Sequence, residues 1–446
     1  MPNIYLTSLG CDKNRVDGET MIGTLRQAGY QVVNDPDIAH CIIVNTCGFI
    51  KDAVEESINL ILELSDHKTN GICKTLIAVG CMAQRYKEEI QNAIPEVDLI
   101  IGVGKYASIA GLLEDSIGKP DGKPQQGAVE TAHPRLAARS DDITPHIAYV
   151  KISEGCDNHC TYCTIPSIRG PYTSRPMEDI YEETHALVTH GAREIVLVAQ
   201  DTSLYGTDIY GEKRLPALLK KLAAIPSLTW IRIMYLYPEH ITQELIDTIA
   251  DTPNIVKYVD MPLQHAETTV LKRMNRAGTT DALHATIKAL QAKGIAIRTT
   301  FIVGFPGETE AEFEGLCQFV QAVGFDRMGV FPYSQEDGTP AAKMPDQIDQ
   351  DTKIERLTEL MAIQQAIHFA KQEAKVGKAV AVMADTENIA RTQHDAYEVD
   401  AVVEIADSPA LVPGQLYQAH ITNMYEYDLL GRIIEDETRG DYEPTK

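Results

Sequence analysis

The sequence predicts an α/β protein in three parts: an N-terminal doubly wound α/β domain, a central partial barrel of six βα units and a small C-terminal β-barrel. Three observations predict this class. Short apolar runs alternate with helical patterns through most of the chain, which is typical of parallel βαβ units. Several of these runs end directly at a cysteine. After Val376 the pattern changes to short strands with Pro and Gly between them, as in a small barrel.

Changes in composition predict the domain boundaries. A chain of 446 residues is long enough for two or three domains. A polar stretch rich in Pro and Gly predicts a linker, and a helical stretch near Thr352–Lys375 precedes the final unit. We therefore expect domains at residues 1–117, 143–373 and 374–446, with the linker at 118–142.

In the first domain, three β-type runs end at a cysteine: NIYLTSLG at Cys11, CIIVNT at Cys47 and TLIAVG at Cys81. The carboxyl ends of parallel strands lie along one edge of a sheet, which is the usual ligand crevice. A single cysteine at a strand end is commonly a small buried hydrophobe. Three in equivalent positions predict a shared site.

The predicted core of this domain includes an amphipathic helix. In AVEESINLILEL, which begins at Ala53, the residues Ile58, Ile61 and Leu62 have the spacing of one buried face. The cysteines that lack the strand-end pattern are interpreted as core residues: Cys41, Cys73 and Cys317.

The central domain is predicted from six strand-length runs separated by stretches long enough for crossover helices, such as 177–190 and 310–323. Six parallel strands make an open or partial barrel, smaller than a complete eightfold one. In parallel barrels the active site lies at the carboxyl ends of the strands. The runs are HIAYVK, EIVLVAQ, TWIRIMYLY, NIVKYVDM, GIAIRTTFIVGF and DRMGVFPY.

The loop GCDNHCTYC follows the first of these runs and carries Cys156, Cys160 and Cys163 in CxxxCxxC spacing. Iron–sulfur clusters are usually held by four cysteines. A triad therefore indicates a cluster with one iron left open for a small molecule, or a distant fourth ligand. The alternative is a structural zinc site that uses His159 as a further ligand, although such sites usually have paired spacings.

Charge and composition limit the classes of partner that the chain is expected to bind. The formal net charge is −24, and residues 374–446 hold six Lys and Arg against fourteen Asp and Glu, a net charge of −8. A surface that follows phosphates should be basic, so tRNA is disfavoured and a basic polypeptide is favoured. A local basic face remains open, formed by Lys272, Arg273 and Arg276.

The compartment is predicted to be the cytoplasm. No apolar stretch approaches the ~20 residues of a membrane span, and no basic region precedes the first β-type run, so no secretory signal is apparent. The nine cysteines form no disulfide framework, which fits a reducing compartment.

A CxxxCxxC loop after the first strand of a six-strand barrel resembles the radical S-adenosylmethionine (SAM) enzymes, and two cysteine triads resemble the methylthiotransferases among them. The motifs are similar to the branch that modifies a ribosomal protein rather than to the tRNA-modifying branch. HAETTVLKRMNRAGTT departs from the usual HASDRVLK. The matching motifs are SLGCDKNRVDGETM, VNTCGFIKDAVEES, IAVGCMAQRY, VKISEGCDNHCTYCTIPSIRG and VDMPLQHA.

This resemblance implies two [4Fe–4S] clusters and SAM as cofactors. The cluster of the CxxxCxxC loop would cleave SAM to a radical, and the cluster of the first triad would present the sulfur. Tyr162 would lie near the adenine, and Gln200 and Arg298 are candidates for holding polar groups of SAM. The resemblance also implies a C-terminal TRAM domain and a low-potential electron donor such as flavodoxin or ferredoxin. The substrate would be one aspartate, modified at its β-carbon, in ribosomal small-subunit protein twelve.

Two alternative functions remain at this point. One is a tRNA adenosine methylthiotransferase of the same fold, and the other is a non-enzymatic metal-binding and RNA-binding module. No acid–base pair is required for the expected reaction. The carboxylates near strand ends are at least as readily structural as catalytic: Glu154, Asp201 and Asp260.

Overall fold

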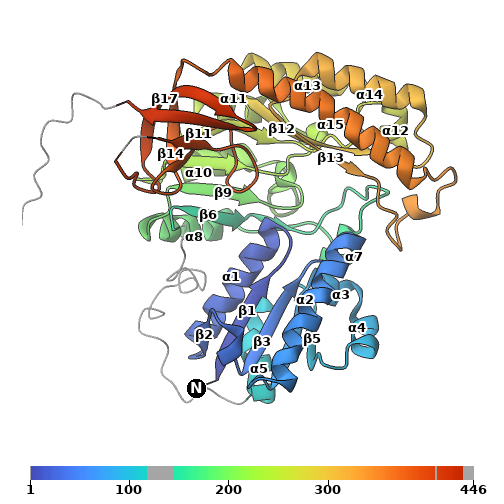
Figure 1. The fold of residues 1–446 in the computed structure, drawn as a ribbon, viewed down its shortest axis with the longest axis vertical. Helices are drawn as coiled ribbons and strands as arrows, with labels where there is room; N and C mark the ends of the chain where they lie inside the picture. Colours follow the sequence, from blue (N-terminus) through green and yellow to red (C-terminus); the bar gives the residue numbers. More distant parts are fainter. Residues whose placement is uncertain (1, 118–144, 407–408, 435–446) are drawn as a thin grey trace, which may run out of the picture.

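The computed structural model describes residues 2–117, 145–406 and 409–434. Its N-terminal part is a parallel sheet of order β2-β1-β3-β4-β5, at the bottom of Figure 1. The helices α1 (Asp12–Gln27) and α5 (Ile109–Ile117) pack on one face, and α2 (Lys51–Thr69), α3 (Cys81–Arg85) and α4 (Lys87–Ala93) on the other. The strands are β1 (Asn3–Ser8), β2 (Gln31–Val33), β3 (Cys41–Thr46), β4 (Thr75–Gly80) and β5 (Leu99–Ile101).

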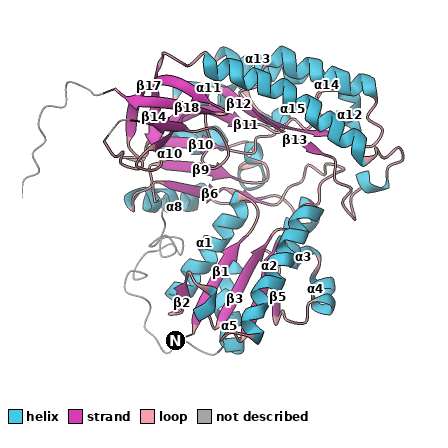
Figure 2. Ribbon diagram, viewed as in Figure 1, coloured by secondary structure: helices cyan, strands magenta, loops and turns pink. Residues whose placement is uncertain are grey.

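The central part is a parallel sheet of order β13-β12-β11-β10-β9-β6, and its strands are the six predicted runs. The helices lie outside it and share one large apolar core with the sheet (Figure 2). The strands are β6 (Ile147–Lys151), β9 (Glu194–Val198), β10 (Trp230–Ile233), β11 (Ile255–Asp260), β12 (Ala296–Val303) and β13 (Arg327–Pro332). The longer helices are α8 (Met177–Thr189), α10 (Leu215–Ala223), α11 (Gln243–Asp251), α13 (Thr280–Ala292), α14 (Glu310–Val323) and α15 (Gln350–Glu373).

The C-terminal part is a closed five-stranded barrel. It covers the amino ends of the central strands, because Met383 and Ala396 pack with Trp230 and Ala296, the first residues of β10 and β12. The Cys156 loop therefore lies at the opposite end of the central sheet. The barrel strands are β14 (Ala379–Ala384), β15 (Ile389–Thr392), β16 (Val403–Ile405), β17 (Leu416–Tyr425) and β18 (Asp428–Ile433).

A buried ionic cluster holds the C-terminal barrel in place. Glu194, the first residue of β9, accepts Arg391 of the barrel at 2.7 Å and Arg232 of β10 at 2.7 Å. Burial raises the pKa of Glu194, but the two guanidinium charges outweigh it and lower that pKa to about 2. Because unpairing such buried charges is costly, we expect the two parts to move together.

The predicted fold class is confirmed, with local differences. Leu62 is 46% exposed, and the buried residues of α2 are Ser57, Ile61 and Leu64. The helix therefore buries a face that is rotated from the predicted one. The short strands β2, β5 and β15 were not predicted. Cys41, Cys73 and Cys317 are buried, as expected of core residues. The domain boundaries stay predictions, and the linker 118–142 lies outside the described residues.

Candidate active site

The first cysteine triad lies at the ends of three neighbouring strands. Cys11 follows β1, Cys47 follows β3, and Cys81 begins α3 directly after β4. The chain is tightly packed here: a Cβ on Gly10 would lie 2.9 Å from the Sγ of Cys47, and the φ of Gly10 is +90°. A side chain would be strained in this position. The structure thus brings the three predicted thiols to one edge of the sheet.

Asn14 ties the loops of this triad together. Its amide donates to the carbonyl oxygens of Leu9 at 2.9 Å and Thr46 at 3.0 Å, and its side chain is fully buried. Its Oδ1 accepts a hydrogen bond from Cys81 at 3.7 Å. Because Asn14 lies in the first turn of α1, it fixes the β1 and β3 loops relative to each other.

The second triad is held by the loop between β6 and α7 (Ile165–Arg169). The amide of Asn158 donates to the Sγ of Cys156 at 3.5 Å, and the backbone N–H of Ile165 donates to the Sγ of Cys163 at 3.5 Å. The Sγ of Cys160 is 3.4 Å from the hydroxyl of Tyr237. Each sulfur therefore has a polar neighbour, and such contacts tune the reduction potential of an iron–sulfur cluster.

The donor sets of both triads fit iron–sulfur clusters. Burial is the main cause that raises the pKa of Cys81 and of Cys156 to about 11, and that of Cys163 to about 12. Without a metal these thiols stay protonated at neutral pH, and iron must displace the protons when it binds. All nine cysteines are free of disulfides. Among the described residues, no three His, Cys, Asp or Glu side chains converge on one metal ion, and His159 is exposed.

Arg169 connects the first triad to the loop that carries the second. Its Nη2 donates to the Sγ of Cys81 at 3.3 Å and to Oδ1 of Asn14 at 2.6 Å. It lies at the end of α7, the short helix that follows Cys163. Its Nη1 pairs with Asp17 and Glu154, each at 3.0 Å, and only 1% of its side chain is exposed. The guanidinium group is therefore a buried spacer between the N-terminal and central parts.

The segment 234–237, after β10, also reaches both triads. The hydroxyl of Tyr235 donates to Asp12, the residue after Cys11, at 3.1 Å, while Tyr237 contacts Cys160. The Nζ of Lys13 lies 3.2 Å from the centre of the Tyr235 ring. One short segment thus contacts the loop of the first triad through Tyr235 and the second triad through Tyr237. Sequence reasoning missed Arg169, Tyr235 and Tyr237.

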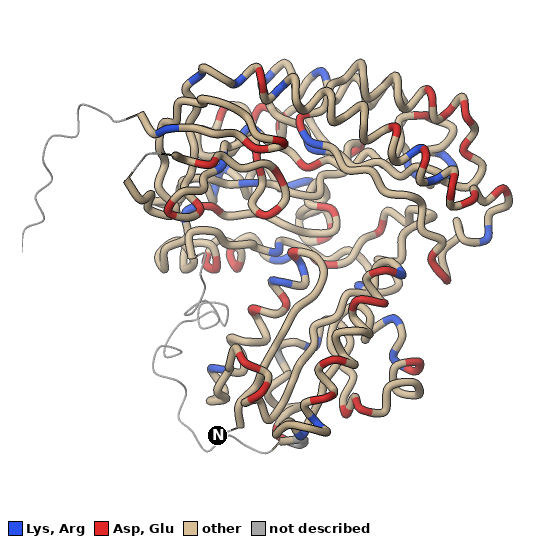
Figure 3. The backbone as a smooth tube through the Cα atoms, in the orientation of Figure 1, with Lys and Arg blue, Asp and Glu red and all other residues tan. Residues whose placement is uncertain are grey.

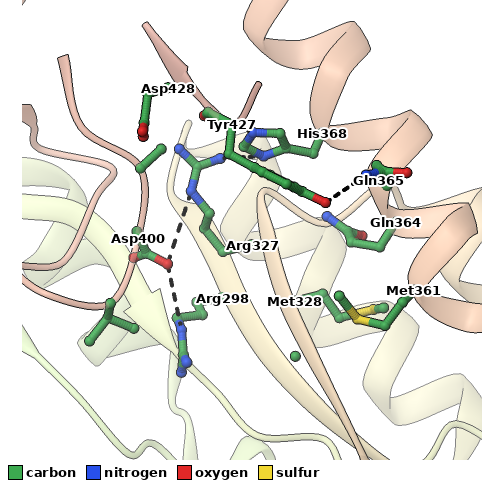
Figure 4. A pocket seen from close by; sticks show the side chains of 13 residues that line it. Arg298, Arg327, Met328, Met361, Gln364, Gln365, His368, Asp400, Tyr427 and Asp428 are labelled. Atoms are coloured by element: carbon green, nitrogen blue, oxygen red, sulfur yellow. Dashed lines mark hydrogen bonds and ion pairs between the residues drawn. The ribbon is translucent and has the colours of Figure 1, made fainter. Parts of the chain in front are cut away.

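The predicted SAM contacts differ in their surroundings. Tyr162 packs against the apolar cluster around Phe305, with ring centres 6.5 Å apart. The amide of Gln200 donates to Glu154 at 2.8 Å, and its buried Oε1 has no partner among the described residues. Arg298 is paired with Asp260 at 2.7 Å and lies farther down the sheet, beside the C-terminal barrel (Figure 4). All three roles stay predictions.

The local basic face suggested by three cations does not form. Arg276 is 5% exposed, and its guanidinium lies 3.9 Å from the centre of the Tyr237 ring. Arg273 pairs with Glu312 at 2.8 Å, which leaves only Lys272 as an exposed, unpaired cation of the three. Figure 3 shows Lys and Arg mixed with Asp and Glu in all three parts.

The three carboxylates near strand ends serve as hydrogen-bond acceptors. Asp201 is fully buried and accepts Asn158 at 2.9 Å and His240 at 3.1 Å, so it supports the Cys156 loop. Asp260 pairs with Arg298, and Glu154 pairs with Lys151 and Arg169. Because each of the three carboxylates has such partners, we interpret all three as structural groups.

Comparisons with known proteins agree with this arrangement. Residues 3–102 match the family model described as uncharacterized protein family UPF0004, residues 150–320 match the radical SAM superfamily, and residues 376–434 match the TRAM domain. The ribosomal protein uS12 methylthiotransferase RimO of Desulforamulus reducens is 44% identical over 98% of this chain and 100% of its own. The chain belongs to the RimO family of methylthiotransferases. RimO of Clostridioides difficile is also 44% identical, over 97% of this chain and 99% of its own.

Solved structures share the fold of this RimO-family chain. The radical SAM methyltransferase TsrM of Kitasatospora setae, with cobalamin and a [4Fe–4S] cluster bound, has a TM-score of 0.56 at 14% identity. The alignment covers 76% of this chain and 77% of TsrM. The cobalamin-dependent enzyme OxsB, with SAM bound, has a TM-score of 0.51 at 11% identity, over 81% of this chain and 56% of its own.

Replacing Arg169 by methionine is expected to destabilise the RimO-family chain by about 2 kcal/mol, because the buried carboxylate of Asp17 loses one of its two cationic partners and keeps only Lys151 at 2.6 Å. The control is Arg214→Met, whose guanidinium and partner Glu212 are 45% and 60% exposed, and which should cost at most about 1 kcal/mol. Denaturant midpoints measure both. Equal midpoints for the two variants would show that the Arg169 pairs are not stabilising.

The stabilisation from the ion pairs of Glu154 should decrease at acid pH. Burial raises the pKa of Glu154, but Lys151 and Arg169 outweigh it and lower that pKa to about 2. The ion pairs therefore contribute fully above the ordinary pKa of glutamate, and their contribution is lost as the pH falls from there toward 2. The Arg169→Met variant lacks one of these ion pairs. Its free energy of unfolding should therefore fall less than that of the wild type over the same pH range.

Proposed function

We propose that this chain replaces a hydrogen on the β-carbon of one aspartate of ribosomal protein uS12 by a methylthio group. It is a radical SAM methylthiotransferase that acts on uS12, with SAM and two [4Fe–4S] clusters as cofactors. The observation that supports the finer assignment is that both cysteine triads border the interface of the N-terminal and central parts, where Arg169 contacts Cys81 and Tyr237 contacts Cys160. A substrate carbon bound at this interface would lie between the site of hydrogen abstraction and the site that delivers sulfur.

The residues of the chain have separate tasks in this proposal. Cys156, Cys160 and Cys163 would hold one cluster and leave one iron for SAM, while Cys11, Cys47 and Cys81 would hold the other. When bound, the first cluster supplies the electron that cleaves SAM, and the second supplies a sulfur to be methylated and transferred.

The surrounding side chains position and shield these groups. Tyr162 lies directly before Cys163, and its ring would lie near the adenine of SAM. Gln200 has a buried, unpartnered Oε1 that would accept a hydrogen bond from the amino group of SAM. We keep Arg298 as a candidate for holding a polar group of SAM; its guanidinium pairs with Asp260 at 2.7 Å and lies 3.6 Å from Asp400 of the C-terminal part. The packed layer around Tyr235 and Tyr237 limits water, which protects a radical from side reactions.

The electron source and the location are part of the same proposal. An electron donor of low potential is required, such as flavodoxin or ferredoxin, and a substrate of the ribosome implies a cytoplasmic location. None of the described helices is long and apolar enough to cross a membrane. The acidic composition supports a basic protein as substrate rather than tRNA.

Reconstituted full-length chain should be incubated with SAM, sulfide and dithionite, and with either purified uS12 or bulk tRNA. Mass spectrometry should find a methylthio group in place of hydrogen on one aspartate of uS12, and no methylthioadenosine in the tRNA. Binding of uS12 should weaken with salt, because exposed charges are screened over about 8 Å at physiological ionic strength. Modified tRNA beside unmodified uS12 would support the tRNA enzyme instead.

A further inference from the structure

Lys13, in the first turn of α1, is a buried lysine whose ammonium group has no oxygen partner among the described residues. It is 8% exposed, and it forms no ion pair or hydrogen bond within residues 2–117, 145–406 and 409–434. Buried lysines are normally paired. Lys353 is buried to a similar degree, and its Nζ donates to the carbonyl oxygen of Tyr333 at 3.0 Å. Lys13 therefore retains donors for a partner outside these ranges.

The contact that Lys13 does make is with an aromatic ring. Its Nζ lies 3.2 Å from the centre of the Tyr235 ring. Such a contact stabilises the cation, but the face of the ring offers no oxygen to the three ammonium N–H groups. The nitrogen is not fully enclosed by the surrounding atoms. A small anionic group can therefore reach it.

The ammonium group lies at the interface that both cysteine triads border. Lys13 belongs to the N-terminal part, two residues after Cys11. Tyr235 belongs to the central part, two residues before Tyr237, whose hydroxyl is 3.4 Å from the Sγ of Cys160. A ligand held by Lys13 would therefore be bound next to the loop of the first triad and close to the segment that contacts the second.

The ring of Tyr235 is held in a fixed position. Its backbone has a φ of +61°, in the left-handed region that a bulky residue rarely adopts. The backbone N–H donates to Asp260 and the hydroxyl donates to Asp12, each at 3.1 Å. Strained backbone of this kind persists where the surrounding structure holds it, and it is frequent at functional sites. The ring thus fixes where the ammonium group of Lys13 lies.

The carboxylates near Lys13 have other partners. Asp12 accepts the hydroxyl of Tyr235. Asp17, one turn later on α1, pairs with Lys151 at 2.6 Å and with Arg169 at 3.0 Å. The amino end of α1 also lies here without a side-chain cap, and the positive end of a helix dipole favours an anion. The local charges therefore favour a carboxylate as the partner of the ammonium group.

We propose that the ammonium group of Lys13 binds the side-chain carboxylate of the aspartate that is modified. This inference rests on the proposed function. The β-carbon of aspartate is bonded directly to its carboxyl carbon, so a charge-assisted hydrogen bond to the carboxylate fixes the reacting carbon at the interface and lowers the entropic cost of the reaction. Adenosine carries no carboxylate, so the same contact selects against tRNA.

The test is a double-mutant cycle on binding. The reconstituted full-length chain with SAM but no reductant, so that no turnover occurs, is titrated with uS12 and with uS12 whose target aspartate is asparagine. The asparagine form should bind the wild-type chain about tenfold more weakly, the loss of a close charge pair. Lys13→Met should bind normal uS12 more weakly by a similar factor, and the asparagine form should then cause little further loss.

The matched control is Lys221→Met. The Nζ of Lys221 lies 5.2 Å from the centre of the Tyr181 ring and pairs with Glu178, so this variant also removes an ammonium group above a tyrosine ring, but far from both triads in the fold. It should bind both forms of uS12 as the wild type does. Lys13→Met should keep the iron content and the SAM cleavage of the wild type, while the methylthio product formed per 5′-deoxyadenosine should fall.

The outcomes separate this inference from the proposed function. If the wild-type chain modified uS12 but bound the asparagine form as tightly as normal uS12, the role of Lys13 would be wrong and the proposed function would stand. Loss of iron in Lys13→Met, with no coupling in the cycle, would assign Lys13 to the cluster of the first triad instead. Failure of the wild type to modify uS12 would overturn both.

Discussion

A variant in which Cys156, Cys160 and Cys163 are all alanine is expected to lose SAM cleavage completely and to keep about half of the iron, since each cube has its own set of at most four thiolates. The remaining iron would be held by the first triad, which is built on a separate sheet with its own core. Anaerobic iron and sulfide determination, with chromatography for 5′-deoxyadenosine, measures both effects.

The control for this variant is Cys317→Ala. Cys317 is buried in α14 among apolar side chains and belongs to neither triad. Its replacement should leave the iron content and SAM cleavage unchanged. If the triple variant lost all of its iron while folded, or none, the two sites would not be independent.

The strands and the cysteine positions could be predicted because they follow from local patterns. β3 and β4 are buried on both faces, which gives a continuous apolar signal, and β1 is partly buried; the cysteine stands one to three residues beyond each strand. The short strands were missed because they lack such a local pattern. β2 and β5 are three residues long, and β15 is interrupted by charge, so none shows a clear period.

The side chains between the triads could not be predicted, because their partners are distant in the sequence. Arg169 bonds to Cys81 across 88 residues, and Tyr235 to Asp12 across 223. The one local signal was the position of Arg169 within the matching motif around the second triad. The basic face left open for Lys272, Arg273 and Arg276 also depended on distant partners, because Arg276 is buried against Tyr237.

A variant in which Cys11, Cys47 and Cys81 are all alanine is expected to cleave SAM at close to the wild-type rate and to form no methylthiolated uS12. The Cys156 loop keeps its own contacts in this variant, because its sulfurs bond to Asn158, Ile165 and Tyr237, none of which depends on the first triad. The sulfur to be transferred would have no cluster to bind it. Product is measured by mass spectrometry of uS12, and cleavage by 5′-deoxyadenosine release.

The contact of Arg169 with Cys81 determines how far the two triads can be changed independently. Removing the Cys81 sulfur takes one acceptor from Arg169, but Asp17 and Glu154 still hold the guanidinium at 3.0 Å. The interface around Arg169 should therefore stay folded, and the melting temperature of the variant should remain near that of the wild type. If SAM cleavage disappeared while the protein stayed folded and the Cys156 cluster stayed loaded, the first triad would be needed for radical generation, and the proposed division of tasks would be wrong.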